Sequence, residues 1–193
     1  MPIRLSAIPI VNISFLSVCV NVGTKPCYFL RAPSYNSIVR KELSLLTDWE
    51  DMNTEYILKD YGPQPLVLNI KKAAKQNNTF RTAVWTGNHL QVTLMSVNAG
   101  DDIGVENHPN LDQFLRIEQG KGLVKMGYTR DNLNLEASVS DDDAIIVPAG
   151  LWHNIINTGN IPLKLYSIYT PPEHPHGTVH KTKADAIAAE HNH

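Results

Sequence analysis

The sequence predicts an all-β protein, built as an antiparallel sandwich or barrel of the jelly-roll type. Short segments of strand-like composition recur along most of the chain and are separated by turn residues, whereas helical patterns are rare. The length of 193 residues fits one domain with a core of its own. Among all-β folds, a double-sheet jelly roll protects its edges and leaves room for an internal pocket.

The first expected strands lead into a hairpin. A short strand at residues 66–70 precedes it. Residues 90–97 alternate between apolar and polar side chains, which is the period of a half-buried strand. Gly87 and Asn88 separate this strand from the one expected at 80–85, and they can supply the positive φ of a tight hairpin turn.

The later strands follow at short, regular intervals. Each is bounded by Gly, Pro, Asn or Asp, the residues that form turns. The expected strands cover residues 113–118, 123–128, 133–139, 144–147, 151–157 and 163–169. Helix is expected only as one turn at 71–76 and as an Ala-rich segment at 183–190, which Thr182 can cap.

The chain divides into three regions: an N-terminal extension at 1–51, the barrel at 60–170 and a C-terminal tail at 171–193. The tail holds five of the eight histidines, which are His174, His176, His180, His191 and His193. They are interpreted either as a second metal site or lid, or as part of a solvated, partly disordered terminus.

The N-terminal extension allows three interpretations. Residues 8–22 are apolar and follow one positive charge, Arg4, as in an export signal or a lipoprotein signal that ends at Cys19. Polar residues and a proline interrupt this run, and it is too short and too polar to span a bilayer. The segment is therefore also interpreted as a β-prone or disordered leader. Translation from Met52 is the third interpretation.

Composition excludes several classes of function. The formal net charge is -2, and Lys and Arg are dispersed, so neither nucleic acid nor a membrane is an expected partner. The only two cysteines, Cys19 and Cys27, are too few for a zinc finger or a disulfide framework. A core without thiols fits the cytoplasm, where we expect the protein. Phosphate-binding and dinucleotide-binding loops are missing from the sequence.

One stretch, residues 100–120, gathers potential metal ligands. Glu106 and His108 are two residues apart, so an extended backbone places both side chains on one face. A turn then brings the chain back to Gln113. His153, after a Pro-Ala-Gly turn, can join them only through the long-range pairing of a closed or sandwiched sheet. We interpret these four residues as one metal site.

These residues resemble the two sequence motifs of the cupin superfamily, G-x5-H-x-H-x3,4-E-x6-G and G-x5-P-x-G-x2-H-x3-N. The first spacing is met by Gly100, Glu106, His108, Gln113 and Gly120. The second is met by Asp142, Pro148, Gly150, His153 and Asn157. More loosely, the chain resembles small bacterial single-domain cupins, some of them labelled spore-coat proteins. The resemblance implies a double-stranded β-helix that holds a divalent transition metal.

The sequence departs from these motifs at three positions. Glu106 replaces the first His, Gln113 replaces the Glu and Asp142 replaces a Gly. The first two changes look like an exchange, because the site keeps one carboxylate at a new position. Imidazole and oxygen donors suit manganese, iron, cobalt, nickel or zinc.

Three functions remain open from the sequence. The first is a metal-dependent enzyme, such as a dioxygenase or a sugar or keto-acid isomerase. The second is a non-catalytic cupin that binds a small molecule, and the third is a structural protein of the spore-coat kind. The fold alone does not choose among them. The resemblance implies a small-molecule ligand, and a homodimer that forms through the sheet faces is a further expectation.

Overall fold

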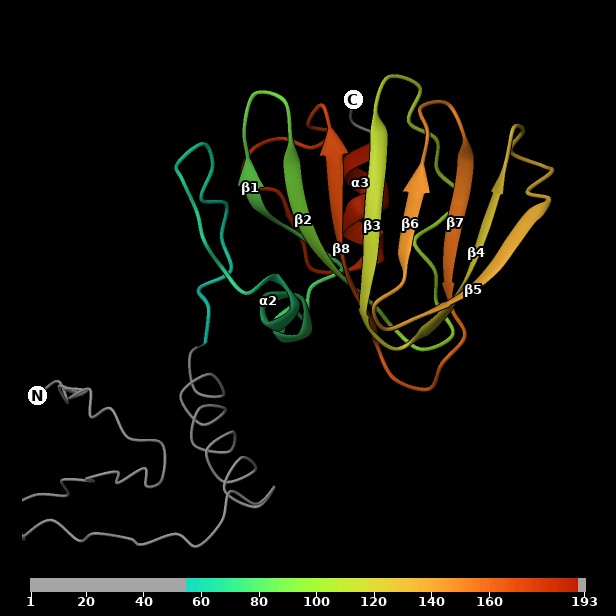
Figure 1. The fold of residues 1–193 in the computed structure, drawn as a ribbon, viewed down its shortest axis with the longest axis horizontal. Helices are drawn as coiled ribbons and strands as arrows, with labels where there is room; N and C mark the ends of the chain where they lie inside the picture. The colour runs from blue at the N-terminus through green and yellow to red at the C-terminus, as the bar shows by residue number, and fades with distance from the viewer. Residues whose placement is uncertain (1–54, 191–193) are drawn as a thin grey trace, which may run out of the picture. The chain divides into compact units, whose positions relative to one another are not determined.

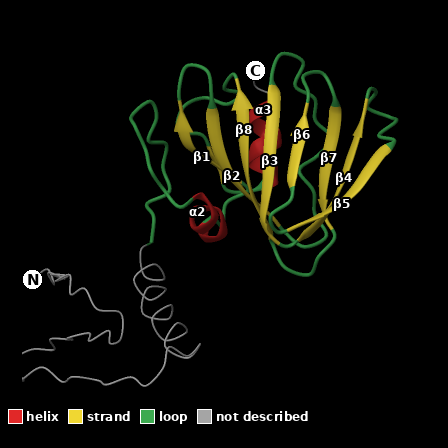
Figure 2. Ribbon diagram, in the orientation of Figure 1, coloured by secondary structure: helices red, strands yellow, loops and turns green. Residues whose placement is uncertain are grey.

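The computed structural model describes residues 55–190, which form two antiparallel β-sheets with short helices packed against them (Figures 1 and 2). In the described residues the larger sheet has the order β6-β3-β8-β2-β1-β9 and the smaller sheet the order β5-β4-β7. The predicted all-β jelly roll is confirmed. Its elements are α2 (Ile70–Gln76), β1 (Arg81–Thr86), β2 (Gln91–Val97), β3 (Asp112–Gln119), β4 (Lys121–Gly127), β5 (Leu135–Ser140), β6 (Ala144–Val147), β7 (Trp152–Asn157), β8 (Leu163–Thr170), β9 (Val179–His180) and α3 (Lys183–Glu190).

The inner face of the larger sheet changes from polar to apolar along its strands. Residues directly opposite each other on paired strands share a face, so the pairing defines rows across the sheet. The row nearest one end of the barrel is Gln91, Tyr169, Gln113 and Val147. The second row is Thr93, Ser167, Leu115 and Ile145, and the third is Met95, Leu165 and Ile117. The polar side chains of these three rows therefore lie at one end, while the buried Arg81, opposite Met95, extends the third row with a charged side chain.

Two apolar clusters stabilise this arrangement. The main core joins the apolar rows of the larger sheet to the smaller sheet, through residues such as Ile155 and Val124. A second cluster lies where α2 packs, with Ala73 and Ala74 fully buried beside Val84 and Leu94. Because β1 and β2 alternate, the residues of this second cluster are those that do not point into the barrel.

Two details of the N-terminal part differ from the sequence prediction. The strand expected at 66–70 is wrong, because α2 already begins at Ile70 and the residues before it pair with no strand within residues 55–190. The Asn69 side chain accepts a hydrogen bond from the Lys72 amide at 3.0 Å and caps this helix. The hairpin of β1 and β2 is confirmed, but neither Gly87 nor Asn88 has a positive φ. A Cβ at Gly87 would lie 2.3 Å from the Trp85 ring, so packing rather than backbone conformation favours glycine there.

The C-terminal segment returns to the barrel. β9 pairs with the edge strand β1, so that His180 lies opposite Arg81. The expected helix is present as α3, and its first turn has reciprocal caps: Thr182 accepts from the Asp185 amide, and Asp185 accepts from the Thr182 amide. The predictions for the N-terminal extension, and for His191 and His193, lie outside the described residues.

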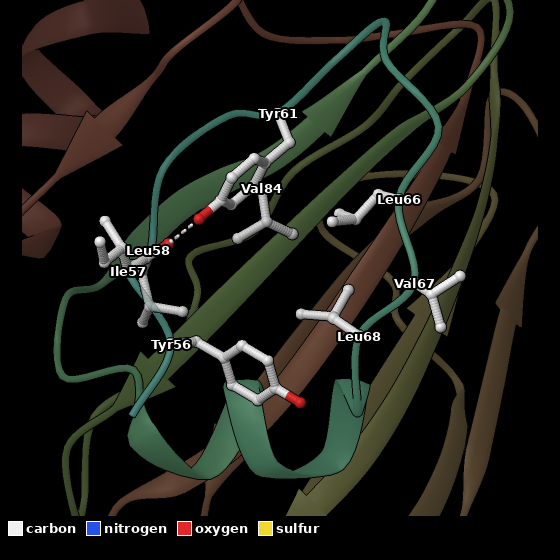
Figure 3. Close-up of a pocket in the computed structure, with 8 residues that line it drawn as sticks. All are labelled: Tyr56, Ile57, Leu58, Tyr61, Leu66, Val67, Leu68 and Val84. Atoms are coloured by element: carbon white, nitrogen blue, oxygen red, sulfur yellow. Dashed lines mark hydrogen bonds between the residues drawn. The ribbon is translucent and has the colours of Figure 1, made fainter. Parts of the chain in front are cut away.

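One hollow of the surface is apolar (Figure 3). Its volume is about 140 Å³, and it is lined by Tyr56, Ile57, Leu58, Tyr61, Leu66, Val67, Leu68 and Val84. Tyr61 donates a hydrogen bond to the Ile57 carbonyl across it at 2.8 Å. None of its residues is a predicted metal ligand. Within residues 55–190, the helices are too short or too polar to cross a bilayer.

Candidate metal centre

Backbone pairing brings Glu106 next to His153. The Glu106 amide donates to the His153 carbonyl at 3.0 Å, and the His153 amide donates to the Glu106 carbonyl at 2.9 Å. The segment around Glu106 thereby extends the smaller sheet beyond β7. This is the long-range pairing that the sequence required, and it places two ligand candidates from separate motifs side by side.

The Pro-Ala-Gly turn before β7 fixes the position of His108. Gly150 has a φ of 80° and donates its amide to the His108 carbonyl at 2.8 Å. Glycine adopts this left-handed conformation without the steric cost that a Cβ brings. The second motif thus supplies His153 and also supports the loop that carries His108.

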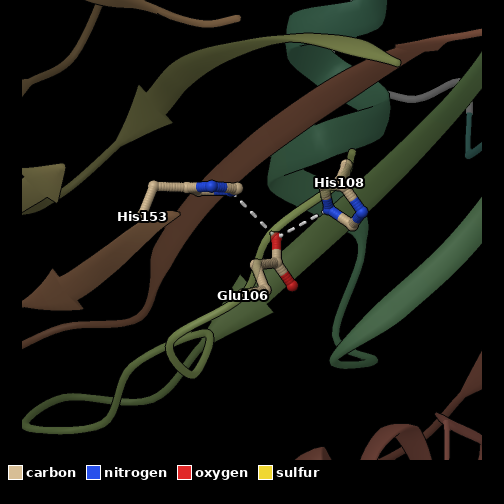
Figure 4. A group of neighbouring side chains, drawn as sticks. All are labelled: Glu106, His108 and His153. Atoms are coloured by element: carbon tan, nitrogen blue, oxygen red, sulfur yellow. Dashed lines mark hydrogen bonds and ion pairs between the residues drawn. The ribbon is translucent and has the colours of Figure 1, made fainter. Parts of the chain in front are cut away.

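The three side chains converge on one carboxylate oxygen (Figure 4). Oε1 of Glu106 lies 3.1 Å from Nε2 of His153 and 3.4 Å from Nε2 of His108. One ligand atom from each residue lies within 4.8 Å of the others. Ligands at normal bond lengths around an octahedral or tetrahedral ion are about 3.0–3.4 Å apart. The spacing of this triad therefore fits a divalent transition metal.

The outward nitrogens of both imidazoles have acceptors. Nδ1 of His153 lies 3.3 Å from the Leu151 carbonyl, and Nδ1 of His108 lies 3.1 Å from Oε1 of Glu173. An acceptor at Nδ1 can hold a ring proton there, so that Nε2 offers its electron pair when a metal is bound, which is how metal-binding histidines are usually held. Nε2 of His108 is buried and faces Oε1 of Glu106 at 3.4 Å.

Gln113 adjoins the triad through Tyr169. It is 2 % exposed and lies opposite Tyr169 in the pairing of β3 and β8, and the Tyr169 ring contacts the His108 ring at 5.7 Å. Its Nε2 donates to Oγ of Ser167 at 3.0 Å. Its Oε1 is buried without a partner among the described residues, so this amide oxygen is available as a ligand.

The charges of the site are coupled. Burial opposes ionisation of Glu106, but hydrogen bonds from His108 and His153 and the charge of Arg81 outweigh it and hold the pKa of this carboxyl far below its usual range. Burial likewise opposes protonation of His108, yet Glu106 and Glu173 raise its pKa to about 9. Without a metal, His108 is therefore positively charged at neutral pH. Its imidazolium then supplies the positive charge next to Glu106 that a bound metal ion would supply.

Asp142, the residue at the missing motif glycine, has a φ of 73°. Its position demands the left-handed conformation, which Asp tolerates better than most residues. Its carboxylate is held by Arg116 at 2.6 Å and by Lys71 at 3.2 Å. Arg116 also pairs with Glu118, whose side chain is fully buried. These cations offset the second carboxylate cluster, formed by Glu118, Asp141 and Asp142.

Three residues of the site's surroundings carry no signal in the motifs. Arg81 is 1 % exposed, and its Nη2 lies 3.8 Å from Oε2 of Glu106. Glu173 supports His108, as described above. His174 packs edge-on against the fully buried Tyr169, with ring centroids 5.2 Å apart. The histidine-rich tail is thus in part packed over the site, whereas the side chain of His176 is 56 % exposed.

A family model described as "Cupin domain" matches residues 93–169. This range includes all four predicted ligands and the strands from β2 to β8, apart from the first residues of β2 and the last residue of β8.

Relatives with similar sequences include proteins described as uncharacterized. YrkC of Bacillus subtilis is 60 % identical over 182 residues, which cover 91 % of this chain and 97 % of that protein. L612 of Acanthamoeba polyphaga mimivirus is 38 % identical over 117 residues, covering 60 % of this chain and 71 % of that protein. The crystal structure of BH2720 from Bacillus halodurans is 64 % identical with a TM-score of 0.67, covering 67 % of this chain and 98 % of that one.

Proposed function

The chain belongs to the cupin family, and on this premise we propose that it is a metal-dependent enzyme that acts on a small, oxygen-rich molecule. The proposed ligands are Glu106, His108, Gln113 and His153. One observation carries the proposal: the Nε2 atoms of His108 and His153 both face the same carboxylate oxygen of Glu106, and the Nδ1 atom of each ring lies near an acceptor of its own. Oriented Nδ1 atoms with converging Nε2 atoms are typical of metal-binding histidines, whereas a purely structural pair of histidines does not require this geometry.

The residues of the centre have complementary roles in this proposal. Glu106 supplies the negative charge, while the two histidines and Gln113 supply neutral donors. Bound there, a divalent ion such as manganese, iron, cobalt, nickel or zinc supplies Lewis-acid or oxygen-activating chemistry. Four protein ligands leave two positions of an octahedron for a bidentate substrate, as in a dioxygenase or an isomerase of sugars or keto acids. Arg81 holds the Glu106 oxygen that faces away from the histidines.

Elemental analysis of the reconstituted protein tests the metal centre. We expect one transition-metal ion per chain in the wild type and none in the double variant His108→Ala/His153→Ala. The matched control is His89→Ala/His176→Ala, which removes two exposed histidines and should keep the ion. A wild type without metal, or a double variant that retains it, would rule out the site.

Substrate screening then separates an enzyme from a binding protein. Iron directs the screen to oxygenase reactions, and manganese or zinc directs it to isomerase reactions. Turnover that disappears with His108→Ala supports the enzyme, whereas stabilisation by a ligand without product supports a non-catalytic binding cupin. The homodimer and the cytoplasmic location stay predictions, which light scattering and cell fractionation can check.

A further inference from the structure

A cluster of polar side chains lies beside the metal centre, at the polar end of the barrel interior. We call it the inner polar cluster; it consists of Arg81, Thr93, Tyr169, His174 and His180. The first three come from β1, β2 and β8 and are at most 1 % exposed. The two histidines come from the C-terminal segment. Ring contacts run from His108 to Tyr169, on to His174 and then to His180, at 5.7, 5.2 and 6.3 Å.

Several buried atoms of this cluster have no hydrogen-bond partner within residues 55–190. They are Oγ1 of Thr93, the hydroxyl of Tyr169, Nε2 of His174 and Nδ1 of His180. The Tyr169 hydroxyl lies close to Thr93 and Ser167, but without normal hydrogen-bond geometry. Native proteins satisfy nearly all buried polar atoms. Four such atoms grouped beside a candidate metal centre therefore indicate that a polar molecule occupies this end of the barrel.

The charges of the cluster favour an anion over a cation. Burial, and after it the positive charge of Arg81, lower the pKa of His174 to about 3 and also lower the pKa of His180. Both imidazoles are therefore neutral at pH 7. The guanidinium that opposes their protonation also repels a metal ion, which disfavours a second metal site built from these histidines. A neutral imidazole and a tyrosine hydroxyl can each donate a hydrogen bond to an oxyanion.

The metal centre adds to this preference. A bound dication and Arg81 are positive charges at this end of the barrel, beside the carboxylates of Glu106 and Glu173. Positive charge in a largely buried site attracts a ligand of opposite charge.

We infer that the inner polar cluster binds the carboxylate of a small organic acid, whose remaining oxygens face the metal centre. Arg81 supplies the charge, and Tyr169, His174 and His180 supply hydrogen bonds. The inference rests on the proposed function, since it names the substrate class of the same site. It assigns to the C-terminal histidines a role in holding the substrate rather than the metal.

Calorimetric titration of the metal-loaded protein tests this inference with malonate, L-malate and malonamide. Malonamide has the shape of malonate but no charge. We expect one acid per chain, and malonamide should bind at least tenfold more weakly. Tyr169→Phe should weaken acid binding on the order of tenfold, because it removes one hydrogen bond to a charged group. Its control is Tyr166→Phe, on the same strand but pointing out of the barrel against Phe114.

A second pair of variants tests the tail. His180→Phe should weaken binding of the acid, and His176→Phe, at an exposed position of the same segment, should not. Elemental analysis should show one metal ion per chain in all variants. The inference is wrong if none of these acids binds, if malonamide binds equally well, or if Tyr169→Phe and His180→Phe have no effect. It is also wrong if the wild type holds two ions and His180→Phe loses one.

Failure of the proposed function gives a different result. If the wild type takes up no metal, the metal centre is wrong. The inner polar cluster contains none of the proposed ligands, so malonate titrated into the metal-free protein still tests it. Binding of malonate that Tyr169→Phe weakens would then uphold the cluster alone.

Discussion

Nδ1 of His108 lies 3.1 Å from Oε1 of Glu173, a residue 65 positions further along the chain. The neighbouring residue, His174, is fixed by Gln91: its amide donates to Oε1 of Gln91 at 2.9 Å, and its carbonyl accepts from Nε2 at 2.8 Å. The C-terminal segment is thus attached to the inner face of β2 where it supports His108. The candidate metal centre has the Glu173 contact to His108 only when this segment is in place.

Glu173→Gln is expected to weaken metal binding by about 10- to 100-fold, the usual effect of losing a partner that orients a ligand. The side chain keeps its size and one oxygen, so the fold should be unaffected. The measurement is competition with a chelator at pH 9, where His108 is partly deprotonated in the wild type. Glu136→Gln is the control, because it removes a half-exposed carboxylate that pairs with Lys125. Equal affinities of wild type and Glu173→Gln would show that Glu173 does not support the centre.

The carboxylate of Glu106 can be tested by restoring the residue of the family pattern. Glu106→His should keep metal binding, since it supplies another nitrogen donor, whereas Glu106→Ala should weaken it. Binding of cobalt followed by absorption spectroscopy reports both affinity and the ligand set. Full occupancy of Glu106→Ala with unchanged affinity would mean that Glu106 is no ligand.

Metal affinity should depend on pH through His108. Its pKa is about 9 in the metal-free protein, so a metal that binds below pH 9 displaces a proton from the ring. The apparent association constant therefore rises with pH, by about tenfold per unit between pH 7 and 9, and levels off above.

Titrations at several pH values, with calorimetry in buffers of different ionisation enthalpy, measure both the slope and the protons released. Glu173→Gln removes one of the two carboxylates that raise this pKa, so its plateau should begin at a lower pH. A metal affinity that does not change between pH 7 and 9 would show that the metal does not displace a proton from His108.

The strands could be predicted from local alternation, and the approach of Glu106, His108 and His153 from the spacing of the two motifs. Alternation of apolar and polar residues indicates a strand without knowledge of its neighbouring strands, as in β2 and β8. The spacing of two motifs placed Glu106, His108 and His153 together, since each motif fixes its side chains relative to a turn. Even Asp142 follows this logic, because it keeps the left-handed conformation of the glycine it replaces.

Arg81 and Glu173 were not predictable, since their roles arise only from long-range contacts. A single arginine in a short strand does not reveal that it faces Glu106 across the barrel. Glu173 follows two prolines in a segment of loop-like composition, and its partner is 65 residues away. The strand expected at 66–70 was wrong for a related reason. Its apolar residues include Leu68, which packs beside α2 in the second apolar cluster, where the described part of the chain offers no strand for pairing.

The adjacent residues Ile145 and Ile146 on β6 test the register that positions the site. Ile145 is 4 % exposed and lies opposite Leu115 in the main core, whereas Ile146 is 67 % exposed. Ile145→Ala should lower the free energy of unfolding by about 2–5 kcal/mol, through lost burial and the cavity left behind. Ile146→Ala should change it by less than about 0.5 kcal/mol.

Urea unfolding of the metal-free variants measures both changes. The two substitutions are chemically identical, so any difference between them comes from the direction of the side chain. A slip of one residue in the pairing of β3 and β6 exchanges the two faces, and Ile146→Ala would then be the costly change. In that case Val147, which lies opposite Gln113, would turn out of the barrel and the wall beside this candidate ligand would change, whereas the pairing of β3 with β8 would keep Gln113 opposite Tyr169.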